Sequence, residues 1–234
     1  MAQKKLLHQK LKSMARKSKG KLIVFEGIDG SGKTTQVTLL LKYLISGKIA
    51  FSHYSFPRYE MPWGKMVRRY LDGEFGNVGE VDPYLASVLY TGDRLSASDD
   101  IRADLASGKI VICDRYIASN IAHQATKLKV KSEKLKFIQW IEQFEYEDNK
   151  IPREDLVVLL SLPPAISQKL MSKKKKDIHE RDENYLIEVG GVYEQLGREK
   201  KNWVKVDCLK NGKLKKPERI FGEVLEILRK REIL

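Results

Sequence analysis

Four residues have the types and spacing of a phosphate-binding loop. Gly27, Gly32, Lys33 and Thr34 fit G-x-x-x-x-G-K-[ST], between an apolar run and apolar residues at helical spacing. In this setting glycines let successive backbone N–H groups and the helix N-terminus point at phosphate oxygens. The lysine adds positive charge at the β- and γ-phosphates, and the threonine hydroxyl can bind Mg²⁺. The alternative is a glycine-rich turn with a solvated lysine; we expect instead an ATP-binding loop of Gly27, Gly30, Ser31, Gly32, Lys33, Thr34 and Thr35.

Composition limits the classes of protein that fit. The chain has 234 residues, of which 42% are hydrophobic, enough for one α/β domain. Its net charge of +13 predicts attraction to nucleic acid, acidic membranes or nucleotide phosphates. The two cysteines, Cys113 and Cys208, suggest neither a disulfide framework nor a zinc site, so a cytoplasmic location is favoured. No apolar run approaches the roughly 20 residues that span a bilayer, so we expect no membrane partner.

Residues 1–20 are basic and lack the apolar core of a signal peptide. An organelle transit segment, a nucleic-acid-binding arm and a solvated helical extension all fit this pattern, and we prefer the extension. This tail could bind polyanions, but we expect the protein to need no nucleic acid.

Alternating strand and helix patterns predict the fold. Five apolar, strand-length runs cover residues 21–25, 50–56, 109–116, 155–164 and 202–208. Helical patterns cover 33–44 and 183–196, a helix follows Pro163 and Pro164, and a long helix capped by Asp82 runs from Pro83 toward Gly108. We therefore expect one α/β domain over 21–234, in three layers, with a five-stranded parallel sheet flanked by helices. Ligands of such sheets bind at the carboxyl ends of the strands.

Several motifs together resemble the thymidylate kinase family. They are "FEGIDGSGKTTQ" at 25–36, "FPRY" at 56–59, "YTGDR" at 90–94, "DRYIASNIAHQ" at 114–124, and a basic loop before "YLIEVGGVYEQL". Their order and spacing match that family over roughly residues 21–230. The resemblance implies a P-loop kinase fold, transfer of the γ-phosphoryl group of ATP to dTMP with Mg²⁺, and a homodimer to which the helix holding Tyr90 contributes.

The resemblance also implies the roles of individual residues around the phosphates. Besides Lys33, catalysis would involve Asp29, which organises the acceptor and metal, and Arg115, which clamps the junction of the phosphates. Asp114 would act on Mg²⁺ through water, with Thr34 as the other metal-binding residue. The alternatives are a turn-forming role for Asp29 and a structural ion pair for the 114–115 dipeptide.

The acceptor would be held by a further set of residues. Arg58 would grip its phosphate, Tyr90 would stack on the base, and Arg94, four residues on, would donate to a base carbonyl. The alternatives are a surface arginine at position 58 and a surface cation–π pair of Tyr90 with Arg94. Histidine at position 123, where relatives usually carry tyrosine or phenylalanine, leaves selection against a ribose hydroxyl open. The full set expected to bind the acceptor is Asp29, Phe56, Arg58, Tyr59, Tyr90, Arg94, Arg115, Asn120, His123 and Gln124, with helix capping or bracing as the alternative for Asn120 and Gln124.

A lid is expected at about residues 172–184, where the sequence is polar and basic. Because the glycine loop offers only Gly30 and Ser31 where some relatives carry an arginine, the mobile positive charge would come from Arg181 or from the lysines at 173–176. A solvated lysine face is the alternative for that run. One of Glu180, Asp182 and Glu183 could assist metal binding.

Two other functions fit parts of the sequence. A kinase for another pyrimidine monophosphate or a nucleoside would keep the fold, and a nucleoside kinase would not need Arg58. An ATP-dependent nucleic-acid-binding module would explain the basic charge, but the aromatic and arginine positions suit a small pocket better.

Overall fold

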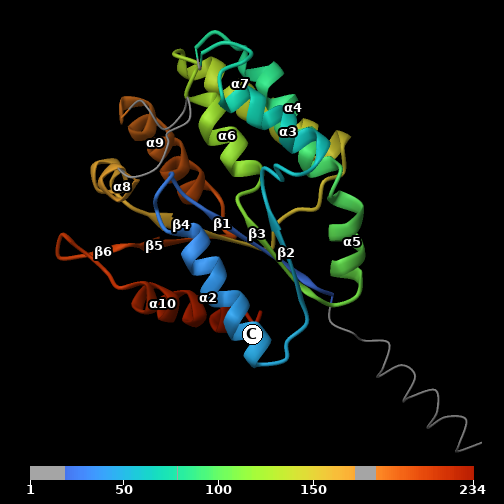
Figure 1. Cartoon of the computed structure of the whole chain (residues 1–234), viewed down its shortest axis with the longest axis vertical. Helices are drawn as coiled ribbons and strands as arrows, with labels where there is room; N and C mark the ends of the chain where they lie inside the picture. Colours follow the sequence, from blue (N-terminus) through green and yellow to red (C-terminus); the bar gives the residue numbers. More distant parts are fainter. Residues whose placement is uncertain (1–18, 78, 172–182) are drawn as a thin grey trace, which may run out of the picture.

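The computed structural model describes residues 19–77, 79–171 and 183–234, and its middle layer is a five-stranded parallel sheet (Figure 1). The strand order is β2-β3-β1-β4-β5. All four pairings between neighbouring strands are parallel, as the continuous apolar runs predicted. The strands are β1 (Lys21–Glu26), β2 (Phe51–Ser55), β3 (Ile110–Asp114), β4 (Leu156–Ser161) and β5 (Trp203–Asp207).

Helices cover both faces of this sheet and complete the predicted three layers (Figure 1). On one face, α2 (Lys33–Ser46) packs beside α10 (Pro217–Lys230). On the other, α5 (Ser98–Ala106), α6 (Ile117–Ala125) and α9 (Glu183–Glu199) contribute to a second core cluster. Outside these lie α3 (Pro62–Leu71), α4 (Pro83–Leu95), α7 (Lys131–Glu142), η1 (Gln143–Asp148) and α8 (Pro164–Met171).

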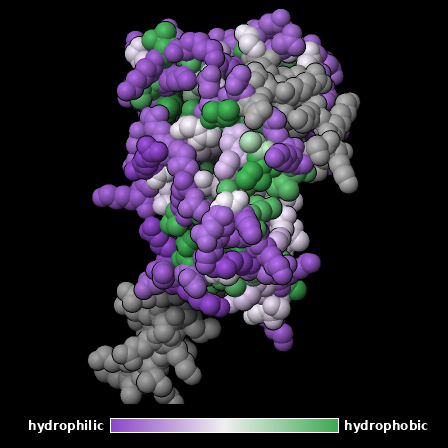
Figure 2. All heavy atoms as spheres, turned by 90° about the vertical axis from the view of Figure 1, so that its left-hand side faces the viewer, coloured by the Kyte–Doolittle hydropathy of each residue, from purple (hydrophilic) through white to green (hydrophobic). Residues whose placement is uncertain are grey.

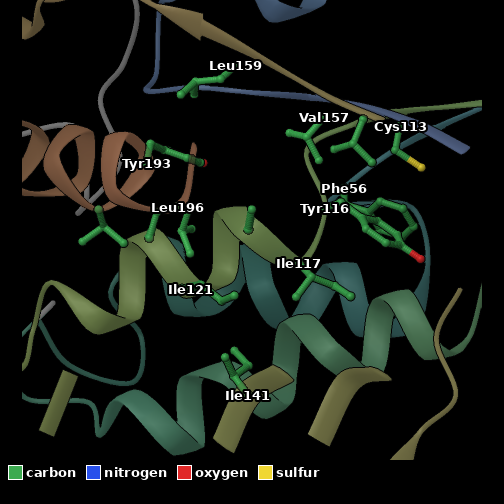
Figure 3. Packing of buried hydrophobic residues seen from close by; sticks show 14 of the residues in the cluster. Phe56, Cys113, Tyr116, Ile117, Ile121, Ile141, Val157, Leu159, Tyr193 and Leu196 are labelled. Atoms are coloured by element: carbon green, nitrogen blue, oxygen red, sulfur yellow. The ribbon is translucent and has the colours of Figure 1, made fainter. Parts of the chain in front are cut away.

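Helix α6 is held by apolar packing on three sides (Figure 3). Ile117 and Ile121 point into a buried cluster with Ile141 of α7, Val157 of β4 and Leu196 of α9. Each of these side chains is at most 1% exposed, so each contributes roughly 1.5–3 kcal/mol of burial free energy. This packing fixes the turn between β3 and α6, which carries Arg115.

The single long helix expected from Pro83 to Gly108 is wrong: α4 ends at Leu95 and α5 begins at Ser98. The predicted cap is present, since Asp82 accepts from the backbone N–H groups of Tyr84 and Leu85 at 2.8 and 3.1 Å. Two serine hydroxyls bond backbone carbonyls at the break: Ser96 Oγ donates to the Asp93 carbonyl at 2.9 Å and Ser98 Oγ to the Leu95 carbonyl at 2.8 Å.

Several elements have no counterpart in the residue ranges that the sequence predicted, among them α3 at Pro62–Leu71. An antiparallel hairpin of β6 (Leu209–Lys210) and β7 (Lys213–Leu214) follows β5, and η1 is a π-helix that continues from α7. The expected lid at 172–184 lies almost wholly outside the described residues, as does most of the extension at 1–20. Among the described helices, none has the length and hydropathy needed to cross a bilayer. The face shown in Figure 2 is largely hydrophilic with hydrophobic groups between.

Candidate functional site

The glycine loop joins the end of β1 to the start of α2, at the carboxyl edge of the sheet. Gly27 has φ 140° and Gly32 has φ 92°, values that favour glycine. A Cβ on Gly27 would also lie 2.5 Å from the carbonyl oxygen of Leu160 in β4, so only glycine lets the loop approach this strand. The loop therefore directs its N–H groups and the N-terminus of α2 toward a common anion position.

Lys33 is buried within this loop, with 6% of its surface exposed. Its ammonium donates to the carbonyl oxygens of Gly27 at 2.9 Å and Ile28 at 2.8 Å. Burial, followed by repulsion from Arg115, lowers the pKa of Lys33 to about 8. The side chain is thus a desolvated cation at the position that the sequence predicted, and an anion would raise its pKa again.

Thr34 and Asp114 come together from the start of α2 and the end of β3. Thr34 Oγ1 donates to Asp114 Oδ2 at 2.8 Å, and Asp114 is 6% exposed. A hydroxyl and a carboxylate are hard oxygen donors that suit Mg²⁺, which is usually held by one or two protein oxygens, phosphates and water. No group of three or more His, Cys, Asp or Glu side chains that could hold a metal ion occurs among the described residues.

Arg115 and Asp29 form an ion pair beside the loop. Arg115 Nη1 also donates to Ser119 Oγ at 3.0 Å. Although burial alone would lower the pKa of Arg115, the Asp29 carboxylate raises it above its ordinary value, so the guanidinium stays charged. The backbone of Arg115 has φ 67°, which costs a residue with a Cβ about 1–2 kcal/mol. The surrounding structure holds the residue in this conformation.

Glu26 was not among the residues selected from the sequence, but it helps to fix the backbone around Arg115. It is fully buried and accepts from Tyr116 N at 2.8 Å, Ser119 Oγ at 2.7 Å and Tyr193 Oη at 2.9 Å. These bonds tie the end of β1 to the first turn of α6. The sequence feature that could have indicated Glu26 is a carboxylate at the end of an apolar strand, directly before Gly27.

Two cavities meet at the ion pair. A larger one of about 560 Å³ follows the loop and includes the expected ATP-binding residues from Gly30 to Thr35. A smaller one of about 80 Å³ lies toward α4 and α6. Because Arg115 faces both cavities, it can bridge anions bound in each. The shared lining residues are Asp29, Phe56, Pro57, Tyr59 and Arg115.

Tyr90, Arg94 and His123 line the smaller cavity. With Asp29, Phe56, Tyr59 and Arg115, seven of the ten residues expected to bind the acceptor lie on this lining. Arg94 is 1% exposed and donates through Nε to Glu145 Oε2 at 2.7 Å. Burial lowers the pKa of His123 to about 3, so this imidazole is neutral. The lining of this cavity includes aromatic rings and two arginines.

Other predicted residues lie beside this cavity rather than on its lining. The Arg58 guanidinium donates to Asp93 Oδ1 at 3.0 Å and to Ser96 Oγ at 2.5 Å. Asn120 is buried in α6, and Gln124 is fully buried with neither amide atom hydrogen-bonded to another described residue. Arg181, the lysines at 173–176, Glu180 and Asp182 lie outside the described residues, as does the side chain of Glu183.

Residues 25–216 match the family model described as thymidylate kinase. A thymidylate kinase of Plasmodium falciparum is 30% identical over 192 residues, covering 82% of this chain and 84% of that protein. A probable thymidylate kinase of Methanocaldococcus jannaschii is 34% identical over 207 residues, covering 88% and 95%. The solved structure of thymidylate kinase from Candida albicans superimposes with a TM-score of 0.73 at 24% identity, covering 92% and 93%, which supports the fold.

The lowered pKa of Lys33 predicts a pH dependence of nucleotide affinity. Below pH 8 the free protein already carries the charged lysine, whereas above it binding of a triphosphate must take up a proton. Affinity should therefore be level up to about pH 7.5 and fall by up to about tenfold per pH unit above pH 8. A fluorescent ATP analogue titrated from pH 7 to 9.5 measures this.

The control is Lys33→Met, which should bind more weakly and lack the loss of affinity near pH 8. A wild-type affinity that stays constant to pH 9.5 would contradict the assignment of this charge to phosphate binding.

Proposed function

Since this chain belongs to the thymidylate kinase family, we propose that it transfers the γ-phosphoryl group of ATP to dTMP, giving dTDP and ADP with Mg²⁺. The observation that carries this proposal is the junction of two cavities at Arg115 and Asp29. One cavity follows a loop suited to a triphosphate, and the other has an aromatic and cationic lining that suits a planar base. Phosphoryl transfer requires two anions to meet in line under positive charge.

The chemistry at the junction is mostly charge stabilisation. Lys33 neutralises the outer phosphates of ATP, and Arg115 spans the donor and acceptor phosphates. Asp29 orients Arg115 through the ion pair and borders both cavities. Thr34 and Asp114 would hold Mg²⁺, which when bound supplies charge neutralisation on the phosphate oxygens. Arg181 is proposed to add a further cation from the lid.

The acceptor pocket supports a deoxynucleoside monophosphate. Tyr90 offers a ring for stacking, while Phe56 and Tyr59 line the region where the cavities meet. Arg58 is proposed to exchange its contacts with Asp93 and Ser96 for the acceptor phosphate, which requires a change of rotamer when dTMP binds. His123, being neutral, forms a pocket wall near the sugar and needs no role as a base, because a phosphate acceptor is already ionised.

A second pyrimidine monophosphate remains the alternative acceptor, because a histidine wall is smaller than the tyrosine or phenylalanine that it replaces. The ATP-dependent nucleic-acid-binding module is set aside, since the family match spans residues 25–216. The buried, unpaired thiols of Cys113 and Cys208 support a reducing, cytoplasmic location.

We further propose a homodimer built on α4. Large apolar side chains are exposed along this helix, where Leu85 is 62% exposed and Leu95 is 40% exposed. Val88 on the same helix and Trp63 on α3 extend the surface. In a twofold dimer the same surface of each copy forms the interface. The apolar strip of one copy would therefore pack against the apolar strip of the other.

The dimer proposal predicts about twice the chain mass of 26.9 kDa by light scattering after gel filtration. Leu85→Glu combined with Val88→Glu should give the monomer, because two buried charges oppose association. Leu135→Glu on α7, a position that is 43% exposed, is the matched control and should stay dimeric. A wild-type protein at the monomer mass would refute the proposal.

The function itself is tested by ADP release with dTMP, dUMP, dCMP, UMP and thymidine in parallel. We expect dTMP to give the highest kcat/KM. Arg115→Ala should lower kcat by at least about 100-fold, since it removes a charge used in the transition state. Arg102→Ala, an exposed arginine on α5, should stay within twofold. Preference for another acceptor would replace dTMP in the proposal.

A further inference from the structure

The small cavity lies between two parts of the molecule that are packed separately. Tyr59, Leu71 and Tyr90 line it from one part, and Ser119 and His123 line it from α6, which packs in the main core. Because attractive contacts weaken over fractions of an ångström, the fit of a ligand depends on how these two parts are held relative to each other. The first part is an outer cluster built around α3 and α4, whose buried members are Val67, Tyr70, Leu71, Val81 and Ala86.

Lys127 joins α6 to the outer cluster. It follows the last turn of α6, where its backbone N–H donates to the Gln124 carbonyl oxygen at 3.1 Å. Its ammonium donates to Tyr70 Oη at 2.8 Å and to the Val81 carbonyl oxygen at 3.1 Å. Tyr70 lies on α3, and Val81 lies just before the start of α4. One side chain therefore connects the end of α6 to both helices of the outer cluster.

The ammonium of Lys127 is withdrawn from water rather than solvated. Besides bonding the Tyr70 hydroxyl, it lies 5.2 Å from the centre of the Tyr70 ring, within the range of a cation–π contact. Burial lowers the pKa of Lys127 to about 8, although the carboxylate of Asp82 partly opposes this shift. A lysine held in this way has a fixed position, unlike the mobile lysines of a solvated surface.

Tyr70 carries this restraint to the cavity. Its side chain is fully buried, and its ring meets the ring of Tyr90 at 88°, with 6.2 Å between the ring centres. Such edge-to-face contacts are a preferred arrangement of aromatic pairs. Tyr90 is the ring that the proposed function stacks on the base of the acceptor. A shift of Tyr70 would therefore change how Tyr90 is presented to that base.

We propose that Lys127 is a positioning residue for the acceptor, which fixes the Tyr90 ring relative to the α6 side of the small cavity by holding Tyr70 and Val81. Lys127 itself is not among the described residues that line either cavity, so it acts through these partners. The inference rests on the proposed function, because it takes a pyrimidine monophosphate as the occupant of the small cavity. Loss of the link should weaken acceptor binding and leave the reacting phosphates unaffected.

The test measures the steady-state kinetics of Lys127→Met, which keeps an unbranched side chain but removes the charge and its hydrogen bonds. We expect KM for dTMP to rise at least about fivefold, while kcat and KM for ATP stay within about twofold. Lys129→Met is the matched control, since this exposed lysine pairs with Glu188 at 3.5 Å, and it should leave all three constants within about twofold. An unchanged KM for dTMP in Lys127→Met overturns the inference, as does a fall in kcat larger than the rise in KM.

A second background tests the route through Tyr90. Tyr90→Leu removes the ring that Lys127 is proposed to position. Adding Lys127→Met to this variant should therefore change KM for dTMP by less than about twofold, because two residues that act through one contact are not additive. A larger further rise in the double variant would mean that Lys127 acts by another route, and would overturn the inference.

Tyr70→Phe answers the question if Lys127→Met does not fold. This substitution keeps the ring that meets Tyr90 and removes only the hydroxyl that the ammonium binds. KM for dTMP should rise at least about threefold with kcat within about twofold, and an unchanged KM overturns the inference. If the wild-type protein phosphorylates none of dTMP, dUMP, dCMP and UMP, the proposed function itself fails, which is distinguishable from an active enzyme whose KM does not depend on Lys127.

Discussion

The buried ammonium of Lys33 is the charge around which the rest of the site is arranged. It donates hydrogen bonds to two backbone carbonyls, and burial lowers its pKa to about 8. A polyphosphate would compete with these carbonyls for the ammonium, because oxygens that carry negative charge accept stronger hydrogen bonds than neutral carbonyls do. The loop glycines are required because carbonyls and N–H groups must both approach this one position.

The parallel sheet places the Lys33 loop next to the turn that carries Arg115, which gives a site for two anions. Strands β1 and β3 are neighbours with parallel register, so the loop after β1 and the turn after β3 leave the same edge side by side. Glu26 at the end of β1 then bonds the first turn of α6, and Arg115 between them is held at a positive φ facing both cavities. Strained backbone at such a position is typical of functional sites.

The sequence predicted the features that depend on local patterns. Apolar runs predicted the five strands, and the loop spacing predicted that Lys33 and Thr34 lie in a phosphate-binding loop. The family resemblance implied that Tyr90, Arg94 and His123 bind the same ligand, and they line one cavity. Contacts between distant segments could not be predicted in the same way. Glu145 meets Arg94 only because η1 packs against α4, and Asp93 holds Arg58 across 35 residues. The break between α4 and α5 was not predicted either, because apolar periodicity alone does not mark where a helix ends.

The central claim is that Lys33 and Arg115 converge on the meeting point of donor and acceptor phosphates. The most direct measurement is a crystal structure with Mg²⁺ and an analogue that joins adenosine and thymidine through a phosphate chain. The account predicts that Lys33 Nζ leaves the carbonyls of Gly27 and Ile28 for phosphate oxygens, and that Arg115 contacts the phosphate on the thymidine side. A complex in which Lys33 remains on those carbonyls and Arg115 points away from every phosphate would contradict it.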